Sequence, residues 1–266
     1  MKKMLIMAMA VFALVACKKS SDTGLPKADA KALEVTTSGA VDMLGDSPKQ
    51  VDAALTDAGY KKIKNGFNPF EYLAPARVVK KATAAKADSD EEVCYGYGIP
   101  DDWDKMTEKQ IIAWANNVIE SGDPVMLVTA TFESNFLNAM ATIFMIKKTN
   151  KANKTYTATS DDLYKKLPSG KNNYAWVGYI GDISRIIKED VSAMTQYTDH
   201  SNFVSKAAKA DGVGAMEYGN ALNKGWSYAT VWANPDASLE KELLEYGLTA
   251  PICIGAYSVS QVNYDF

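Results

Sequence analysis

The chain has 266 residues, a formal net charge of −3 and an apolar fraction of 47%. That fraction is ample for a packed core and excludes a disordered stalk. The sequence has no block of basic residues, which argues against nucleic acid as a partner. The length allows one large domain or two small ones.

The N-terminus has the charge and hydropathy of an export signal. Lys2 and Lys3 precede an apolar run of 13 residues, Met4 to Ala16. This run is shorter than the roughly 20 residues that a transmembrane helix needs. Its length and its flanks are typical of the hydrophobic region of a signal peptide. We therefore predict that residues 1–16 are removed on export.

The run ends in Leu14-Val15-Ala16-Cys17, which resembles the lipobox of bacterial lipoprotein precursors. In that family the precursor is cut before the cysteine, whose sulfur then carries a diacylglycerol and whose new amine is acylated. The resemblance implies that Cys17 is lipidated, and two or more acyl chains hold a protein stably on a membrane. Lys18 is not the aspartate that retains some lipoproteins in the inner membrane, so the resemblance favours an outer-membrane anchor in the cell envelope. Whether the body faces the periplasm or the cell surface stays open. An ordinary secretory signal with a chance cysteine is the alternative.

The mature chain divides by composition into a tether and a body. Its charge is 27 − 32 = −5 once Lys2 and Lys3 are removed. Residues 17–40 are rich in small and polar residues without an apolar period, which predicts a flexible tether. Residues 41–266 are expected to form the globular body. A subdivision near 80–92, which lacks large apolar residues, or near 181 is the alternative.

Two capping boxes predict two helices early in the body. The boxes lie at 47–50 and 107–110, and the helices are expected to end at Gly59 and Gly122. The second helix precedes an extended apolar segment, 125–132. The similarity of the two starts suggests a duplicated helix-strand unit.

The rest of the body alternates short strand patterns with helical stripes. Strands are expected at 141–146, 156–159, 174–180, 213–218, 226–233 and around 253, and helices at 183–194, 203–208 and 239–246. Lys147 to Lys154 reads as a polar, basic loop between two of these strands. Hairpin spacings mixed with helices predict an α+β fold, with a mainly antiparallel sheet and packed amphipathic helices.

Motifs for catalysis or metal binding are largely missing from the sequence. There is one histidine, His200, and no HExxH, CxxC or GxSxG pattern. Asp199 and Ser201 flank His200, but adjacent side chains do not easily point at one another, so a capping or loop histidine is favoured over a triad. The acidic run 101–104 lacks the spacing of a calcium loop, and it precedes a helix, where carboxylates suit the dipole. We expect no metal, no cofactor and no catalytic residue.

Two cysteines remain after lipidation of Cys17. Cys94 and Cys253 lie in strand-like stretches and would be exported to an oxidising compartment, where paired thiols tend to form disulfides. A bridge between them would close a long loop, and the chain-entropy model gives about 5 kcal/mol for such a loop. We favour this disulfide over the alternative of two separately buried cysteines.

The most regular pattern is the alternation between residues 226 and 233. Period two places Trp226, Tyr228 and Trp232 on one face of a strand, and Tyr174 and Trp176 share a face on another. Exposed, these aromatic side chains could stack sugars or receive an apolar partner. The alternative, which is favoured because Trp is heavily buried on average, is that they are core.

Taken together, these patterns predict a membrane-anchored cell-envelope lipoprotein that acts as a non-catalytic binding module for a glycan or protein partner. Two alternatives stay open. One is an envelope hydrolase that acts on polysaccharide or peptidoglycan through carboxylates which the sequence does not identify. The other is a structural assembly lipoprotein.

Overall fold

A computed structural model describes residues 23–63, 91–170, 172–182, 191–208, 212–236, 240–241, 247–249 and 251–261. The predicted helices at 183–194 and 239–246 and the predicted linker at 80–92 therefore lie wholly or mostly outside the described residues. Within the described part of the chain, no helix has the length and apolar character needed to cross a membrane.

Helices and strands follow one another along the whole described chain. They are α2 (Lys27–Thr36), α3 (Ala40–Met43), α4 (Pro48–Asp57), β1 (Tyr60–Ile63), β2 (Glu91–Tyr97), the 3-10 turn η1 (Trp103–Lys105), α6 (Glu108–Ser121), β3 (Val125–Glu133), β4 (Phe136–Lys147), α7 (Asn150–Lys166), β5 (Tyr174–Asp182), the 3-10 turn η2 (Val191–Ala193), β6 (Thr195–Tyr197), α9 (His200–Ala207), β7 (Val213–Ala221), β8 (Trp226–Asn234) and β9 (Ile252–Gln261).

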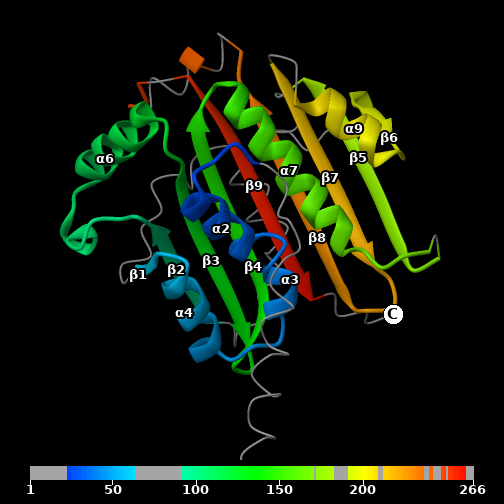
Figure 1. Cartoon of the computed structure of the whole chain (residues 1–266), viewed down its shortest axis with the longest axis horizontal. Coiled ribbons are helices and arrows are strands. Elements are labelled where there is room, and N and C mark those ends of the chain that lie inside the picture. Colours follow the sequence, from blue (N-terminus) through cyan, green and yellow to red (C-terminus); the bar gives the residue numbers. More distant parts are fainter. Residues whose placement is uncertain are drawn as a thin grey trace, which may run out of the picture.

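The strands form one nine-stranded sheet in the order β1-β2-β3-β4-β9-β8-β7-β5-β6, and every neighbouring pair is antiparallel (Figure 1). The predicted α+β fold with a mainly antiparallel sheet is confirmed. β1 precedes the possible boundary at 80–92 and β2 begins at its end, yet the two strands pair directly. Residue 181 lies within β5, which pairs with both β6 and β7. The sheet is thus continuous across both positions at which a subdivision was considered.

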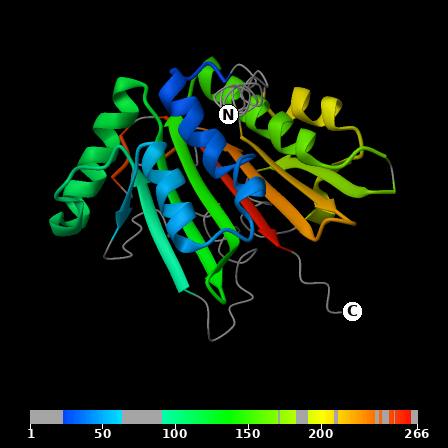
Figure 2. The ribbon, with the colours of Figure 1, turned by 60° about the horizontal axis from the view of Figure 1, so that its bottom comes forward.

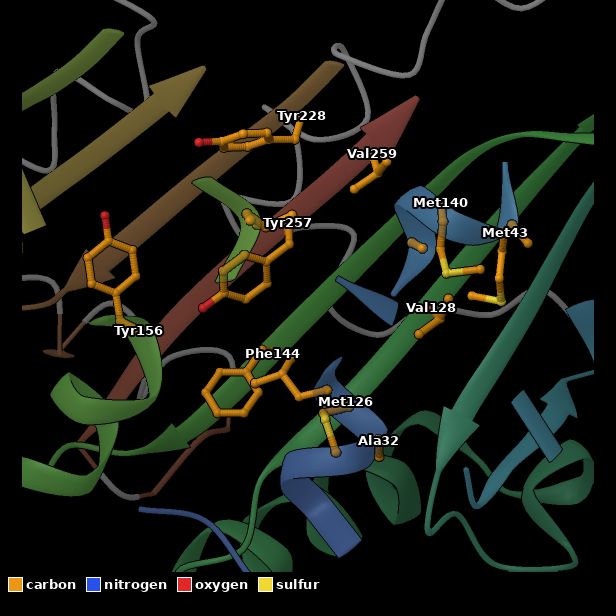
Figure 3. Packing of buried hydrophobic residues seen from close by; sticks show 14 of the residues in the cluster. Ala32, Met43, Met126, Val128, Met140, Phe144, Tyr156, Tyr228, Tyr257 and Val259 are labelled. Atoms are coloured by element: carbon orange, nitrogen blue, oxygen red, sulfur yellow. The ribbon is translucent and has the colours of Figure 1, made fainter. Parts of the chain in front are cut away.

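The main core lies between one face of the sheet, here called the helical face, and the helices α2, α3, α4, α7 and α9 (Figure 2). Figure 3 shows Phe144 and Tyr257 on the strands near Tyr156 of α7, and Met126 near Ala32 of α2. All five side chains are fully buried. The burial of large apolar and aromatic side chains on this face is the dominant stabilising term of the fold.

The second face of the sheet, here called the opposite face, is covered differently. Helix α6 packs Ile111, Ala115 and Ile119 against Leu127 and Met145 of β3 and β4, which alternate with the residues of the main core. The helix-strand units α4–β1 and α6–β3 both form as predicted, with the capping boxes in place. Their helices nevertheless lie on opposite faces of the sheet.

Helix α9 is held close to the sheet at a glycine. The ring of Phe203 lies over Gly178 of β5, where an added Cβ would come within 2.5 Å of that ring. Only a residue without a side chain allows this approach. The glycine therefore sets how α9, and His200 at its first position, sit against β5 and β7.

The predicted tether is wrong for most of its length, because α2 packs into the core. Asp29, Ala32, Leu33 and Thr36 are buried at the spacing of one helix face. Their short side chains give a weak apolar pattern in the sequence, but they fit a close approach of α2 to the sheet. The body therefore includes α2 and starts before residue 41.

The predicted strand at 156–159 and the predicted basic loop at 147–154 are also wrong, because α7 runs from Asn150 to Lys166. β-Branched threonines favoured the strand prediction. In the helix, the hydroxyls of Thr155, Thr157 and Thr159 each donate to the carbonyl four residues earlier, at 2.9–3.0 Å. Burial against the sheet then outweighs the local preference.

Candidate functional site

The aromatic residues at 226–232 do not form an exposed row. Trp226, Tyr228 and Trp232 are 6%, 2% and 0% exposed and lie on the helical face, under α7 and α9. Trp232 stacks on Tyr156 of α7 with ring centroids 4.9 Å apart. The prediction of a binding surface here is wrong, and the alternative, that these side chains are core, is correct. The alternation identified residues that share a face, but it did not show that helices cover that face.

Tyr174 and Trp176 of β5 are half-buried at the edge of the same core. The hydroxyl of Tyr174 lies 3.1 Å from that of Tyr164 on α7. The indole of Trp176 packs edge-on against Phe203 and directs its Nε1 inward. The structure therefore brings these two residues close to Tyr228, as predicted for one continuous face, but as part of the core.

A carboxylate lies inside this core. Glu217 of β7 is 0% exposed. The indole Nε1 of Trp176 donates to its Oε2 at 3.1 Å, and the hydroxyl of Thr230 donates to its Oε1 at 3.2 Å. His200 Nε2 lies 3.5 Å from the same Oε2. A buried carboxylate is costly unless such partners surround it, so these three side chains make its burial tolerable.

His200, predicted as a capping or loop residue, is the first residue of α9 and is buried. The cap itself is Asp199, whose carboxylate accepts from the backbone N–H of Asn202 at 2.9 Å. The imidazole stacks on Tyr164 with ring centroids 4.0 Å apart. Its Nε2 is 3.1 Å from the hydroxyl of Ser160 on α7. Sequence reasoning missed Ser160 and Glu217, because they are far from His200 in the chain and belong to no motif.

Ser160, His200 and Asp161 meet in an order that resembles a catalytic triad, since His200 Nδ1 lies 3.6 Å from Asp161 Oδ1. Ser160 is nevertheless 0% exposed and lies within α7, where the helix uses the backbone N–H groups that an oxyanion hole would need. Burial raises the pKa of Asp161, and the nearby His200 and Lys165 oppose that rise. The cluster is therefore a polar part of the core without the features of a hydrolytic site.

Three phenols lie beside Glu217. The hydroxyls of Tyr156, Tyr228 and Tyr257 have no hydrogen-bond partner of normal geometry within the described structure. Figure 3 shows these side chains at the junction of α7 with β8 and β9. Burial, with the charge of Glu217 adding to it, raises the pKa of Tyr156 and Tyr228 well above the usual value, so both stay neutral.

A hollow on the opposite face is the better candidate for a binding site. Its volume is about 410 Å³, which lies in the range of small-molecule sites. It spans β5, β7, β8 and β9. Its described lining consists of small or uncharged residues: Ala175, Trp176, Val177, Tyr218, Gly219, Asn220, Ser227, Tyr228, Ala229, Ser258 and Ser260.

The register of the strands explains the hollow. Asn220 of β7 pairs with Ser227 of β8, which pairs with Ser260 of β9, so their side chains share the opposite face. The hydroxyls of Ser227 and Ser260 are 3.3 Å apart on its floor. Tyr218 is 38% exposed and is the largest side chain on this face of the lining. Trp176, Gly219 and Tyr228 occupy strand positions of the helical face, so only their backbone atoms line the hollow.

The predicted disulfide is wrong, because Cys94 and Cys253 do not form one within the described structure. Cys94 lies on β2 and Cys253 on β9, and two strands, β3 and β4, separate them. Three strand spacings amount to about 14 Å, far beyond the Cα separation that a disulfide bridges. The alternative of two separate cysteines holds: Cys253 is fully buried and Cys94 is half-buried.

Within the acidic run at 101–104, Asp101 forms an ion pair with Lys61. Lys61 Nζ lies 2.6 Å from Asp101 Oδ1, and this ion pair lowers the pKa of that carboxyl. Within the described residues, no group of three or more His, Cys, Asp or Glu side chains is arranged to hold a metal ion.

Comparison with known proteins gives no assignment: no family model, no curated protein and no solved structure matches this chain.

Proposed function

We propose that this protein is a cell-envelope lipoprotein, anchored in the outer membrane through lipid on Cys17, whose body is a non-catalytic binding module for a neutral glycan. The observation that carries the binding role is the hollow on the opposite face. Among its described lining residues none carries a charge, and three serines and an asparagine line it beside the aromatic ring of Tyr218. The anchor is supported by the signal-like N-terminus and by Leu14-Val15-Ala16-Cys17.

The lining suits the chemistry of a sugar. Hydroxyls such as those of Ser227 and Ser260 both donate and accept hydrogen bonds, as do sugar hydroxyls, and the Asn220 amide contains both donor and acceptor groups. The ring of Tyr218 offers an apolar face with a polar tip, which suits a pyranose whose C–H groups and hydroxyls alternate. A charged ligand would lack a countercharge among these residues.

The binding role is tested with the full chain purified in detergent. It is screened against neutral and charged envelope glycans, and the best ligand is then titrated by calorimetry. We expect neutral glycans to be selected and Tyr218→Ala to weaken their binding at least tenfold. Phe136→Ala is the matched control, since Phe136 is 56% exposed on the sheet but does not line the hollow. Equal losses in both variants, or selection of charged glycans alone, would contradict the proposal.

The anchor is tested separately by metabolic labelling with radioactive palmitate in a bacterial host. We expect the wild-type chain to be labelled and recovered with the outer membrane, and Cys17→Ala to be unlabelled. Labelling that persists in Cys17→Ala would place the lipid elsewhere and refute this part of the proposal.

A further inference from the structure

The N-terminal end of the body is fixed on the first turns of α7. The hydroxyl of Thr155 donates to the carbonyl of Thr23 at 3.0 Å, and Gly24 lies against the side chains of Lys151 and Lys154. Leu25 follows and packs against the main core. The chain therefore enters the body at one defined place on the helical face.

This place lies at one end of the sheet, here called the anchor end. Lys151 Nζ donates to the carbonyl of Gly122, just before β3 begins. Lys147, the last residue of β4, pairs with Ile252, the first residue of β9. The start of α7, the end of β4 and the start of β9 thus lie together at the upper end of the sheet in Figure 1.

The hollow lies at the other end. Ser258 and Ser260 are near the last residue of β9, and Ser227 comes directly after the β7–β8 turn. From Ile252 to Ser260 the strand advances eight residues, or about 27 Å. The hollow also opens on the opposite face of the sheet, whereas Thr23 lies against α7 on the helical face. Anchor end and hollow are therefore separated both along the sheet and across it.

The connection from the proposed lipid to the anchor end is short. Six Cα-to-Cα steps lead from Cys17 to Thr23 (23 − 17 = 6), and they span at most about 22 Å. Lys27 and Lys154 are exposed beside the entry point, and Lys18 and Lys19 follow Cys17 in the sequence. Lysines near a bilayer surface are attracted to anionic headgroups, by about 1 kcal/mol each.

We infer that the anchored protein stands with its anchor end toward the bilayer and its hollow facing away, roughly 25–50 Å above the surface. This inference rests on the proposed lipid anchor at Cys17. It deepens the proposed function, because the glycan that reaches the hollow belongs to a polymer beyond the anchoring bilayer. A headgroup of that same bilayer cannot reach it.

The orientation is measured by energy transfer from the protein to acceptor-labelled headgroups in vesicles that contain anionic lipid. The full lipidated chain carries a donor dye at Lys154→Cys or at Lys224→Cys, two exposed lysines at the anchor end and in the β7–β8 turn. Both variants also carry Cys94→Ser, and the fully buried Cys253 is shielded from the dye. We expect transfer from position 224 to be less than about half of that from position 154.

Flotation of the vesicles separates failure of the anchor from failure of the orientation. Protein that does not float with them refutes the anchor. Protein that floats but shows equal transfer from both positions, or stronger transfer from 224, refutes the orientation alone. As a control, a flexible insert of about 20 residues between Ser21 and Asp22 should make the two transfer efficiencies converge, because it releases the constraint of the short connection.

Discussion

The contact between His200 and the buried carboxylate of Glu217 predicts a large loss of stability in His200→Leu. The substitution removes the imidazole that lies 3.5 Å from Glu217 Oε2 and leaves that carboxylate with two donors, from Trp176 and Thr230. Leaving a buried polar group without one of its partners costs about 1–3 kcal/mol, and more where that group is charged. Ser160, whose hydroxyl lies 3.1 Å from Nε2, loses the same imidazole. The lost stack on Tyr164 adds about 0.5–1.5 kcal/mol, and leucine retains part of the apolar burial.

We therefore expect the free energy of unfolding of His200→Leu to fall by about 3 kcal/mol, which corresponds to a decrease in Tm of roughly 6–12 °C for a body of this size. Urea unfolding followed by tryptophan fluorescence measures the loss. Lys206→Ala, at an exposed position of α9, is the matched control and should change stability by less than about 0.5 kcal/mol.

A second substitution shows whether the charge is the cause. Glu217→Gln in the His200→Leu background removes the uncompensated charge while keeping an acceptor for Trp176, so it should restore at least half of the loss. A loss below about 1 kcal/mol in the single variant, or no recovery in the double variant, would refute the reasoning that the imidazole compensates Glu217.

Three further predictions concern residues of the sheet that are buried or half-buried. Gly219→Ala should destabilise the fold by about 1–3 kcal/mol, because an added Cβ would lie 2.2 Å from the ring of Tyr228; unfolding at the wild-type midpoint would contradict this. Burial and a neighbouring carboxylate raise the pKa of Tyr97 from 10.0 to about 12, so the folded state favours the neutral phenol. The free energy of unfolding should thus fall as pH rises from about 10 to about 12, and less steeply in Tyr97→Phe; equal slopes would count against it. Under native conditions a thiol reagent should modify the half-buried Cys94 slowly and the fully buried Cys253 only after unfolding; a native protein without titratable thiols would show that they are bridged.

The fold class could be predicted from the sequence because its strongest local signals agree with the packing. The capping boxes at 47–50 and 107–110 and the apolar segment 125–132 form as expected. The predictions failed where packing decides against local preference. Threonines at 155–159 favour a strand in isolation, but helical burial against the sheet and back-bonded hydroxyls outweigh that preference.

The candidate sites were less predictable, because each depends on long-range pairing. Alternation grouped Trp226, Tyr228 and Trp232 correctly on one face, but whether helices cover that face is a property of the whole fold. The hollow is assembled from small residues of four strands that only the sheet register brings together. The alternation that includes Ser227 and Ala229 is visible in the sequence, but the residues of β5, β7 and β9 that complete the hollow are not adjacent to it in the chain.

The most direct test of the central claim is calorimetric titration of Ala229→Trp with the neutral glycan selected in the screen. Ala229 lies in the hollow and is half-exposed, so the indole fills the hollow from the opposite face without entering the main core. The account predicts that glycan binding is lost while the Tm stays within about 2 °C of the wild type. Glycan binding that persists at wild-type affinity in this variant would show that the hollow is not the binding site.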